Sequence, residues 1–266
     1  MTKEVQQNRR KFLGKLGLTM GAGLGATPVL ASQENKVIVE EFWVDMRKAG
    51  ADVTGKVKNT PLIKNTIEQL ANAGGGTLYF PPGKYLTGAI HLLSNITLHL
   101  EGGAELIFSE DFDDYLPMVP SRWQGMAVKN FSPLIYANNA RNIRIAGNGT
   151  INGSGQVWWD YILKKRATYK QTGNEPGSKW QDAFLQENQD REQLQSFGFL
   201  RPSLFQVYHC EDVFLQGVFL RNSPFWTTHF VECNRVVVDS IDIYNSDSPN
   251  TDGINPESSR NVRISN

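Results

Sequence analysis

One short pattern recurs through this chain: a polar residue, then alternating apolar positions, then a glycine or a small polar residue. The copies are SNITLHLEGG (94–103), RNIRIAGNG (141–149), EDVFLQG (211–217), NRVVVDS (234–240) and RNVRIS (260–265). Aligned on Asp212, Asn234 and Asn261, the last three copies lie 22 and 27 residues apart. Alternation with a period of two predicts strands that turn one face toward a core.

Shorter apolar segments fall between these copies, so each repeat holds two or three strands. They are LIYANN (134–139), LFQVYHC (204–210), TTHFVECN (227–234) and IDIYNS (241–246). Such a unit cannot bury its apolar side alone, so repeats stack and each strand pairs with its counterpart in the next coil. We therefore predict an all-β fold, a right-handed parallel β-helix. A β-sandwich also has regularly spaced short strands, but it accounts less well for the Asn and Asp residues that start each copy and favour stacked turns.

Two segments depart from the repeat. Residues 59–88 read as a helix, a glycine stop and a strand, and this helix would cap the N-terminal end of the solenoid. Residues 156–200 are charged and aromatic without alternation, which predicts a partly helical insertion. Trp158 and Trp159 in it could stack on a sugar ring, but we favour a role in anchoring the insertion to the solenoid.

The first 31 residues are typical of an export signal. Arg9, Arg10 and Lys11 precede a Gly- and Ala-rich apolar stretch that ends in a small-residue cleavage site. The stretch is shorter than the about 20 apolar residues of a membrane span, and the paired arginines resemble a twin-arginine signal. We therefore expect an exported protein, periplasmic or extracellular, with no membrane span and a β-helix domain over residues 32–266. A buried N-terminal helix is the alternative.

Charge and cysteine content exclude several classes of function. Residues 1–31 hold five basic residues and one acidic residue, so without them the formal net charge changes from zero to −4. We predict no nucleic-acid partner, because a broad basic surface is absent. Cys210 and Cys233 each precede a repeat copy, and we expect them to pack in adjacent coils rather than form a disulfide. The scattered histidines and the lack of a CxxC pair predict no metal site and no cofactor.

The most reactive-looking acid is Asp252, in the polar stretch NSDSPNTDGINP (245–256). Its neighbours are hydrogen-bonding side chains, among them Asp247 and Asn250. On spacing alone this stretch reads as a turn, because Asp-Gly and Pro-Asn occur in turns of any protein.

Three ordered blocks resemble the polygalacturonase family, glycoside hydrolase family twenty-eight. They are residues 74–106, 201–238 and 250–266, which are spread over most of the mature chain. The resemblance implies a right-handed parallel β-helix that hydrolyses pectic polysaccharide with inversion and without a metal. The Asn-Thr-Asp motif of the family matches Asn250, Thr251 and Asp252. Asp252 would then be one of three catalytic aspartates.

The other motifs of the family are not found after Asp252. An Asp-Asp pair occurs only at Asp113-Asp114, and neither Gly-His-Gly nor Arg-Ile-Lys occurs. This predicts a C-terminally truncated sequence whose last coils are missing, which leaves an open apolar end and a chain inactive by itself.

Four residues are the candidates for the site. Asp252 is the predicted catalytic residue, and Asn250, His229 and Asp247 are predicted to bind substrate. His229 lies one coil before Asp252, and the alternative for it is a histidine on the face of a coil with a local hydrogen bond. Arg201 and Arg221 could meet a uronate carboxylate, but single arginines on a polar face are usually solvated or paired.

Three functions remain open on the sequence. The first is an exported hydrolase of polygalacturonate or a related galacturonan, a monomer when full length. The second is a non-catalytic, pectin-binding or vestigial β-helix. The third is a pectate lyase, which would typically require Ca²⁺, and no convincing acidic cluster for this ion is found. The sequence leaves open the type of galacturonan and the choice between endo and exo cleavage.

Overall fold

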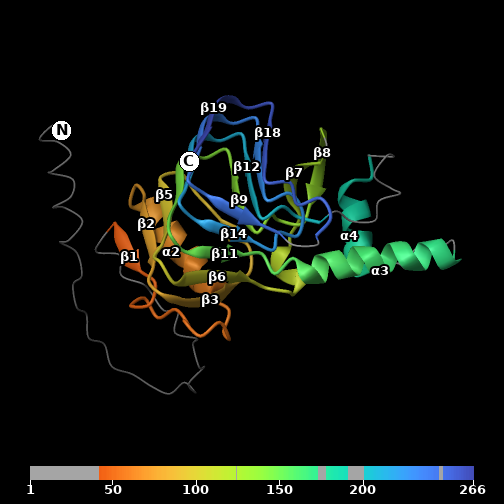
Figure 1. Cartoon of the computed structure of the whole chain (residues 1–266), viewed down its shortest axis with the longest axis horizontal. Helices are drawn as coiled ribbons and strands as arrows, with labels where there is room; N and C mark the ends of the chain where they lie inside the picture. Colours follow the sequence, from red (N-terminus) through yellow and green to blue (C-terminus); the bar gives the residue numbers. More distant parts are fainter. Residues whose placement is uncertain (1–41, 124, 173–177, 191–200, 246–247) are drawn as a thin grey trace, which may run out of the picture. The chain divides into compact units, whose positions relative to one another are not determined.

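The structure is a computed structural model that describes residues 42–123, 125–172, 178–190, 201–245 and 248–266. The predicted signal, residues 1–31, lies outside the described residues. Within residues 42–266 the chain winds into a right-handed parallel β-helix, as predicted (Figure 1). Each complete coil contributes one strand to each of three parallel sheets, which we name A, B and C. The parallel pairing excludes the β-sandwich.

The sheets are made of strands that recur in the order C, A, B along the chain. Sheet A holds β1 (Trp43–Asp45), β2 (Gly76–Phe80), β5 (Ile96–Leu100), β10 (Arg141–Gly147), β13 (Glu211–Gln216), β16 (Asn234–Asp239) and β19 (Arg260–Ser265). Sheet B holds β3 (Gly83–Thr87), β6 (Ala104–Phe108), β11 (Thr150–Asn152), β14 (Phe219–Arg221) and β17 (Asp242–Tyr244). Sheet C holds β4 (Ile90–His91), β9 (Ile135–Asn138), β12 (Phe205–Tyr208), β15 (Thr228–Val231) and β18 (Ile254–Glu257).

The core consists of apolar side chains stacked in register from coil to coil. In sheet A, Ile145 pairs with Leu98 on one side and Leu215 on the other, and all three are fully buried. Burying one such side chain stabilises the fold by roughly 1.5–3 kcal/mol. The same row continues through Val238 to Ile264 in the last described coil, where the side chain is 54 % exposed.

A column of residues with positive φ forms the turn between sheets C and A. It consists of Asn95, Asn142, Asp212, Arg235 and Asn261. The register pairs Asn234 with Glu211 rather than with Asp212, so the alignment of the copies on Asn234 was wrong by one residue. The physical reason is that Arg235 itself adopts the left-handed conformation, at φ 58°, with its guanidinium on the Asp212 carboxylate. Asn234 instead begins the strand.

The predicted N-terminal cap is present. Helix α2 (Thr60–Asn72) buries Ile63, Ile67 and Leu70, and it contacts strands of sheets A and C. Pro61 lies in its first turn, where a missing N–H costs nothing. This helix therefore covers core side chains of the first coils.

All long excursions leave the solenoid between sheets B and C. The first holds the 3-10 helix η1 (Phe112–Tyr115) and a hairpin of β7 (Val119–Trp123) and β8 (Met126–Asn130). The second, after β11, holds α3 (Gln156–Thr172) and α4 (Lys179–Glu187), so the predicted insertion is partly helical. The two later connections between these sheets, 222–227 and 245–253, are short. The excursions and the Asp252 turn thus leave the same corner of the coils.

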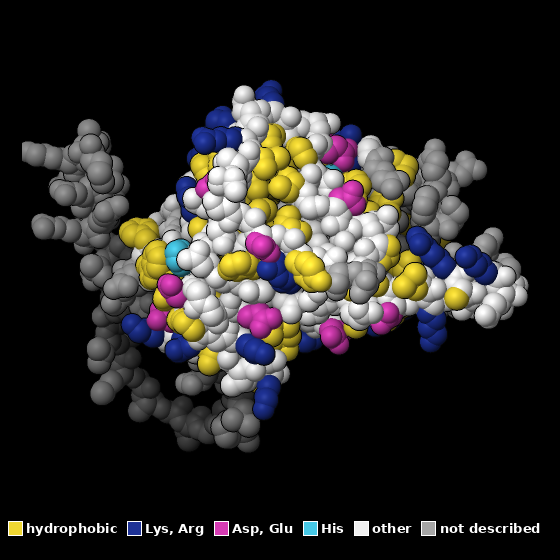
Figure 2. Space-filling view, in the orientation of Figure 1, with side chains coloured by type: hydrophobic (Ala, Val, Ile, Leu, Met, Phe, Trp, Pro, Cys, Tyr) yellow, Lys and Arg dark blue, Asp and Glu magenta, His cyan; other side chains and the backbone are white. Residues whose placement is uncertain are grey.

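The insertion is attached by its aromatic side chains. Trp158 and Trp159 are 0 % and 5 % exposed, and the ring of Trp158 stacks on Phe112 at 3.8 Å. The rest of α3 extends away from the coils and carries exposed Lys164, Arg166 and Lys170 (Figures 1 and 2). The anchoring role predicted for the two tryptophans is confirmed.

The two cysteines are also placed as predicted. Cys210 and Cys233 are buried, free thiols just before β13 and β16, which are adjacent and in register. No helix within the described part of the chain has the length and apolar character needed to cross a bilayer.

Candidate active site

The turn that carries Asp252 is held by backbone hydrogen bonds to the preceding coil. The Thr227 N–H donates to the Asp252 carbonyl at 2.8 Å, and the Thr228 N–H donates to the Gly253 carbonyl at 3.0 Å. These bonds begin the pairing of β15 with β18. The Asp252 side chain is exposed, and no other described residue bonds to its carboxylate. The backbone of this turn is therefore fixed, and it presents a carboxylate that no other described residue contacts by a hydrogen bond.

Side-chain hydrogen bonds hold the same turn from inside. Asn245 Nδ2 donates to the buried Thr227 hydroxyl at 2.9 Å, while its Oδ1 accepts the Ser223 N–H at 2.8 Å. The Thr227 hydroxyl donates to the Thr251 carbonyl at 3.3 Å. Asn250 is exposed and has a φ of 61°, a conformation that Asn tolerates better than most residues. The Asn-Thr-Asp segment therefore lies at the surface on a well-supported turn.

The remaining polar candidates are placed differently. Asp247 lies outside the described residues, so its predicted contact with substrate stays a prediction. Arg221 forms an ion pair with Asp242, at 2.5 Å from Nη2 to Oδ1, and is therefore paired.

His229 does not share the exposed surface of Asp252. Its side chain is 1 % exposed, and it points out of sheet C in the same row as Asn255 of the next coil. The prediction that His229 binds substrate is corrected by this burial, because no part of the imidazole reaches the surface. Its position matches the alternative, a histidine on the face of a coil with local hydrogen bonds.

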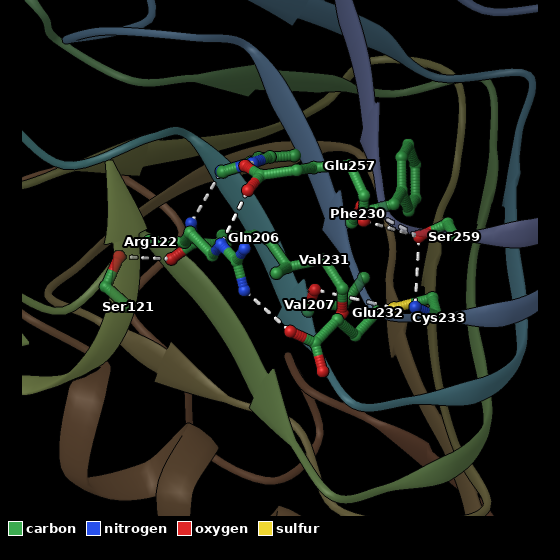
Figure 3. A network of polar contacts seen from close by, with 11 residues as sticks. Ser121, Arg122, Gln206, Val207, Phe230, Val231, Glu232, Cys233, Glu257 and Ser259 are labelled. Carbon is green, nitrogen blue, oxygen red and sulfur yellow. Dashed lines mark hydrogen bonds and ion pairs between the residues drawn. The ribbon is translucent and has the colours of Figure 1, made fainter. Parts of the chain in front are cut away.

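His229 belongs to a series of five side chains in contact, which the peptide link between Ser121 and Arg122 closes into a ring. Figure 3 labels the other four, Ser121, Arg122, Gln206 and Glu257. The Ser121 hydroxyl donates to Gln206 Oε1 at 2.7 Å, and Gln206 Nε2 lies 2.7 Å from His229 Nδ1. His229 Nε2 lies 2.9 Å from Glu257 Oε2, and Arg122 Nε closes the ring at 2.6 Å from Glu257 Oε1. We call this set the polar ring. It joins the hairpin to β12, β15 and β18.

The polar ring specifies one form of the imidazole. Because Gln206 accepts from Ser121 with its oxygen, its nitrogen must face His229 and donate to Nδ1. Nδ1 is then unprotonated, and Nε2 carries the hydrogen that is donated to Glu257. A second proton on Nδ1 would meet the Gln206 amino group, so the network favours neutral His229.

We expect the pKa of His229 to make the protein less stable in mild acid. Burial lowers this pKa below its ordinary 6.5, and the nearby Glu257 carboxylate offsets only part of that effect. The unfolded chain therefore binds this proton more readily, and stability falls as the pH drops below about 6.5. Urea unfolding at about pH 7.5 and about pH 5.5 measures the loss. The loss should shrink in His229→Gln, and an equal loss in both proteins would contradict this origin.

The hairpin covers the outer face of sheet C. The Tyr136 hydroxyl donates to the Pro120 carbonyl at 2.7 Å, and the Trp123 ring stacks on Phe225 at 4.1 Å. Arg122 also pairs with Glu232 at 2.6 Å. Outward-pointing side chains of sheet C, such as Tyr136 at 5 % exposure, are therefore covered from the early coils to β18, where Arg122 contacts Glu257.

The early Asp-Asp pair supports the insertion. Asp113 accepts hydrogen bonds from Lys179 at 2.5 Å and from the Trp180 indole at 2.8 Å. The Lys179 bond is the main cause of the lowered pKa of Asp113. Asp114 pairs with Lys58 at 2.5 Å. Asp113 therefore joins the two excursions to each other, and Asp114 joins the first excursion to Lys58, just before α2.

The sequence did not identify three residues that organise this site. Ser121 and Glu257 were not distinguished from ordinary polar residues. Arg201 was considered as a contact for a uronate carboxylate or as a solvated or paired cation, not as a buried residue. Glu257 lies five residues after Asp252, in a strand whose alternate side chains point out of the coil. This position could have identified it from the sequence as an outward-pointing acid. Among the described residues, no group of three or more His, Cys, Asp or Glu side chains could hold a metal ion.

Comparisons with known proteins agree with this architecture. Residues 166–266 match the family described as Glycosyl hydrolases family 28. A probable polygalacturonase of Vitis vinifera is 30 % identical over 219 residues, which cover 79 % of this chain and 38 % of that protein. An exo-poly-alpha-D-galacturonosidase of Dickeya chrysanthemi is 26 % identical over 247 residues, 84 % of this chain and 39 % of that protein.

A solved structure shows the same similarity in three dimensions. The hyperthermoactive exopolygalacturonase of Thermotoga maritima is 33 % identical, with a TM-score of 0.70 over 84 % of this chain and 51 % of that one. The chain spans 38 % and 39 % of the length of the two curated relatives above. The chain belongs to glycosyl hydrolase family 28.

Proposed function

We propose that this chain is part of a hydrolase that cleaves glycosidic bonds in polygalacturonate or a related pectic galacturonan. The observation that carries the proposal is Asp252: an exposed carboxylate without a described partner, on a turn fixed by the preceding coil. It lies within the segment that matches the family. Polysaccharide substrates suit an exposed sheet face along a solenoid, because the polymer can lie across several coils.

The proposed reaction is inverting and independent of metal. Such an enzyme needs a carboxyl group that protonates the leaving oxygen and a carboxylate that activates water, roughly 6.5–9.5 Å apart. We assign the activation of water to Asp252, acting with a further carboxylate, and assign substrate binding to Asn250. Glu257 does not serve as the partner, because its two oxygens contact His229 and Arg122.

We further propose cleavage from a chain end. The hairpin covers the outer face of sheet C from β9 to β18, where Tyr136, Gln206 and Glu257 contact it. A polymer lying on this sheet would meet the hairpin on one side of the Asp252 turn, so a chain end fits better than an internal segment. Two relatives of this chain are named as exo-acting enzymes.

The product pattern from polygalacturonate tests this proposal. With the protein as its host makes it, we expect new reducing ends and, from the earliest times, only short products of one size. Chromatography of the products and viscosity of the polymer are measured in parallel. A rapid loss of viscosity with oligomers of many sizes would contradict exo cleavage, and no new reducing ends would contradict hydrolysis.

Non-catalytic binding of pectic chains is the second candidate. It is favoured by one observation: no described acidic side chain is placed as a partner of the Asp252 carboxylate. Binding of oligogalacturonate without any release of reducing ends would support it.

We also propose export of the protein. The basic residues and apolar stretch of residues 1–31 support this proposal. The mass of the mature protein from its host would identify the cleavage position.

A further inference from the structure

Arg201 is a buried cation directly beneath the Asp252 turn. The residue is 4 % exposed. Its Nη1 donates to the carbonyl of Pro224 at 2.8 Å and to that of Pro249 at 2.9 Å, and its Nη2 donates to Asn250 Oδ1 at 2.9 Å. The guanidinium carbon lies 5.1 Å from the Phe225 ring centre. One side chain thus connects the turn at 222–227 with the turn that carries Asp252.

Arg201 has no carboxylate partner among the described residues. Burial lowers the pKa of its guanidinium to about 10, and the nearby Arg166 contributes in the same direction. The group therefore keeps its charge at neutral pH. Among the described residues, its hydrogen-bond acceptors are three oxygen atoms, and two of them are backbone carbonyls.

These contacts determine which way the Asn250 amide faces. A guanidinium has only donors, so it can accept nothing from an amide nitrogen. The Asn250 oxygen must therefore face Arg201, and its NH₂ group must face away. No described residue accepts a hydrogen bond from that NH₂ group, and the side chain is exposed. Asn250 thus presents two free N–H donors at the surface, two residues before Asp252.

We infer that Arg201 is a positioning residue that orients the Asn250 amide as a donor for the carboxylate or hydroxyl oxygens of a uronide. The identity of the ligand rests on the proposed function. Two donors on one nitrogen suit an acceptor-rich group such as a carboxylate. In a reversed amide the oxygen would face the ligand and repel its negatively charged carboxylate. The selectivity of Asn250 therefore depends on a residue that does not touch the ligand.

The matched variants separate orientation from anchoring. Asn250→Asp keeps an oxygen for Arg201 but removes both donors and adds a charge. Asn250→Ala removes both functions. Arg201→Lys keeps the charge, but a single ammonium cannot reproduce the planar fork that bonds all three oxygens. Unfolding midpoints of all variants report whether the turn itself is intact.

The test is the affinity for trigalacturonate, measured by calorimetry on the full chain. We expect Asn250→Asp to unfold at or above the wild-type midpoint yet bind at least about tenfold more weakly, the effect of a lost hydrogen bond to a charged group. Arg201→Lys should also weaken binding. In a chain that already carries Arg201→Lys, Asn250→Ala should then reduce the affinity little further, because an amide that is not oriented contributes little to binding.

Other outcomes would overturn the inference. If the losses of binding free energy from Arg201→Lys and Asn250→Ala are additive in the double variant, Arg201 does not act through Asn250. If wild type fails to bind trigalacturonate, the proposed function fails, and the orientation is tested separately by NMR. The Asn250 NH₂ hydrogens should exchange rapidly with water, as exposed donors do. Protection of these hydrogens would place the nitrogen, not the oxygen, against the interior and overturn the orientation.

Discussion

Asp252→Asn should reduce the release of reducing ends from polygalacturonate by about 10²- to 10⁴-fold, the usual contribution of a general acid or base. The amide has the same shape as the carboxylate but cannot take a proton from water. Because the native carboxylate is exposed and bonds to no other described residue, the change should leave the fold intact. The assay uses the protein as its host makes it.

Asp242→Asn is the matched control for this prediction. Asp242 lies in β17, just before the same turn, and its side chain is 58 % exposed. It pairs with Arg221 of the preceding coil, in the neighbouring strand of sheet B. We expect this variant to keep its activity. Retention of wild-type activity by Asp252→Asn would remove Asp252 from the mechanism.

His229→Phe should be the most damaging single change in the polar ring, with a loss of about 3 kcal/mol in the free energy of unfolding. The substitution removes two hydrogen bonds from a site that is 1 % exposed. It leaves the Gln206 amino group without an acceptor and leaves one oxygen of Glu257 without its donor. Buried polar groups that lose a partner cost more than the bond itself contributed. Urea unfolding at about pH 7.5 measures the change, since His229 is neutral there.

Asp212→Asn provides the comparison for this second prediction. The Asp212 carboxylate contacts Arg235 of the next coil at 2.6 Å and 2.8 Å, so it also connects two coils. That pair is exposed, and exposed ion pairs contribute little to stability. We expect its unfolding midpoint to stay close to that of wild type. If His229→Phe behaved like Asp212→Asn, the polar ring would not stabilise the hairpin.

The solenoid could be predicted because its cause is local. Alternation within each copy, as at Ile143 and Ile145, identifies strands, and repetition without intervening helices indicates parallel stacking. The register was predicted less well at Asn234. A polar start was taken to mean a left-handed turn, but Arg235, one residue later, adopts that conformation and pairs with Asp212 of the previous coil. Such a partner in another coil is not visible in a single copy.

The candidate site was predicted only where a motif carried it. Asp252 and Asn250 lie together in the sequence, so the resemblance located both. The polar ring depends on contacts such as Ser121 to Gln206, which are 85 residues apart in the chain. The burial of Arg201 likewise depends on carbonyls that come from two later turns. Side-chain type alone does not predict these placements, because separate excursions must first meet at one corner.

The hairpin changes how the coils respond to stress. A stack of coils that touch only their neighbours can open one coil at a time from an end, since each interface contributes separately. Here Arg122 holds Glu232 and Glu257, and Ser121 holds Gln206, so one excursion fastens three successive coils. A force applied to β18 must therefore break its attachment to the hairpin as well as its pairing with β15. These three coils form a single mechanical unit within an otherwise sequential array.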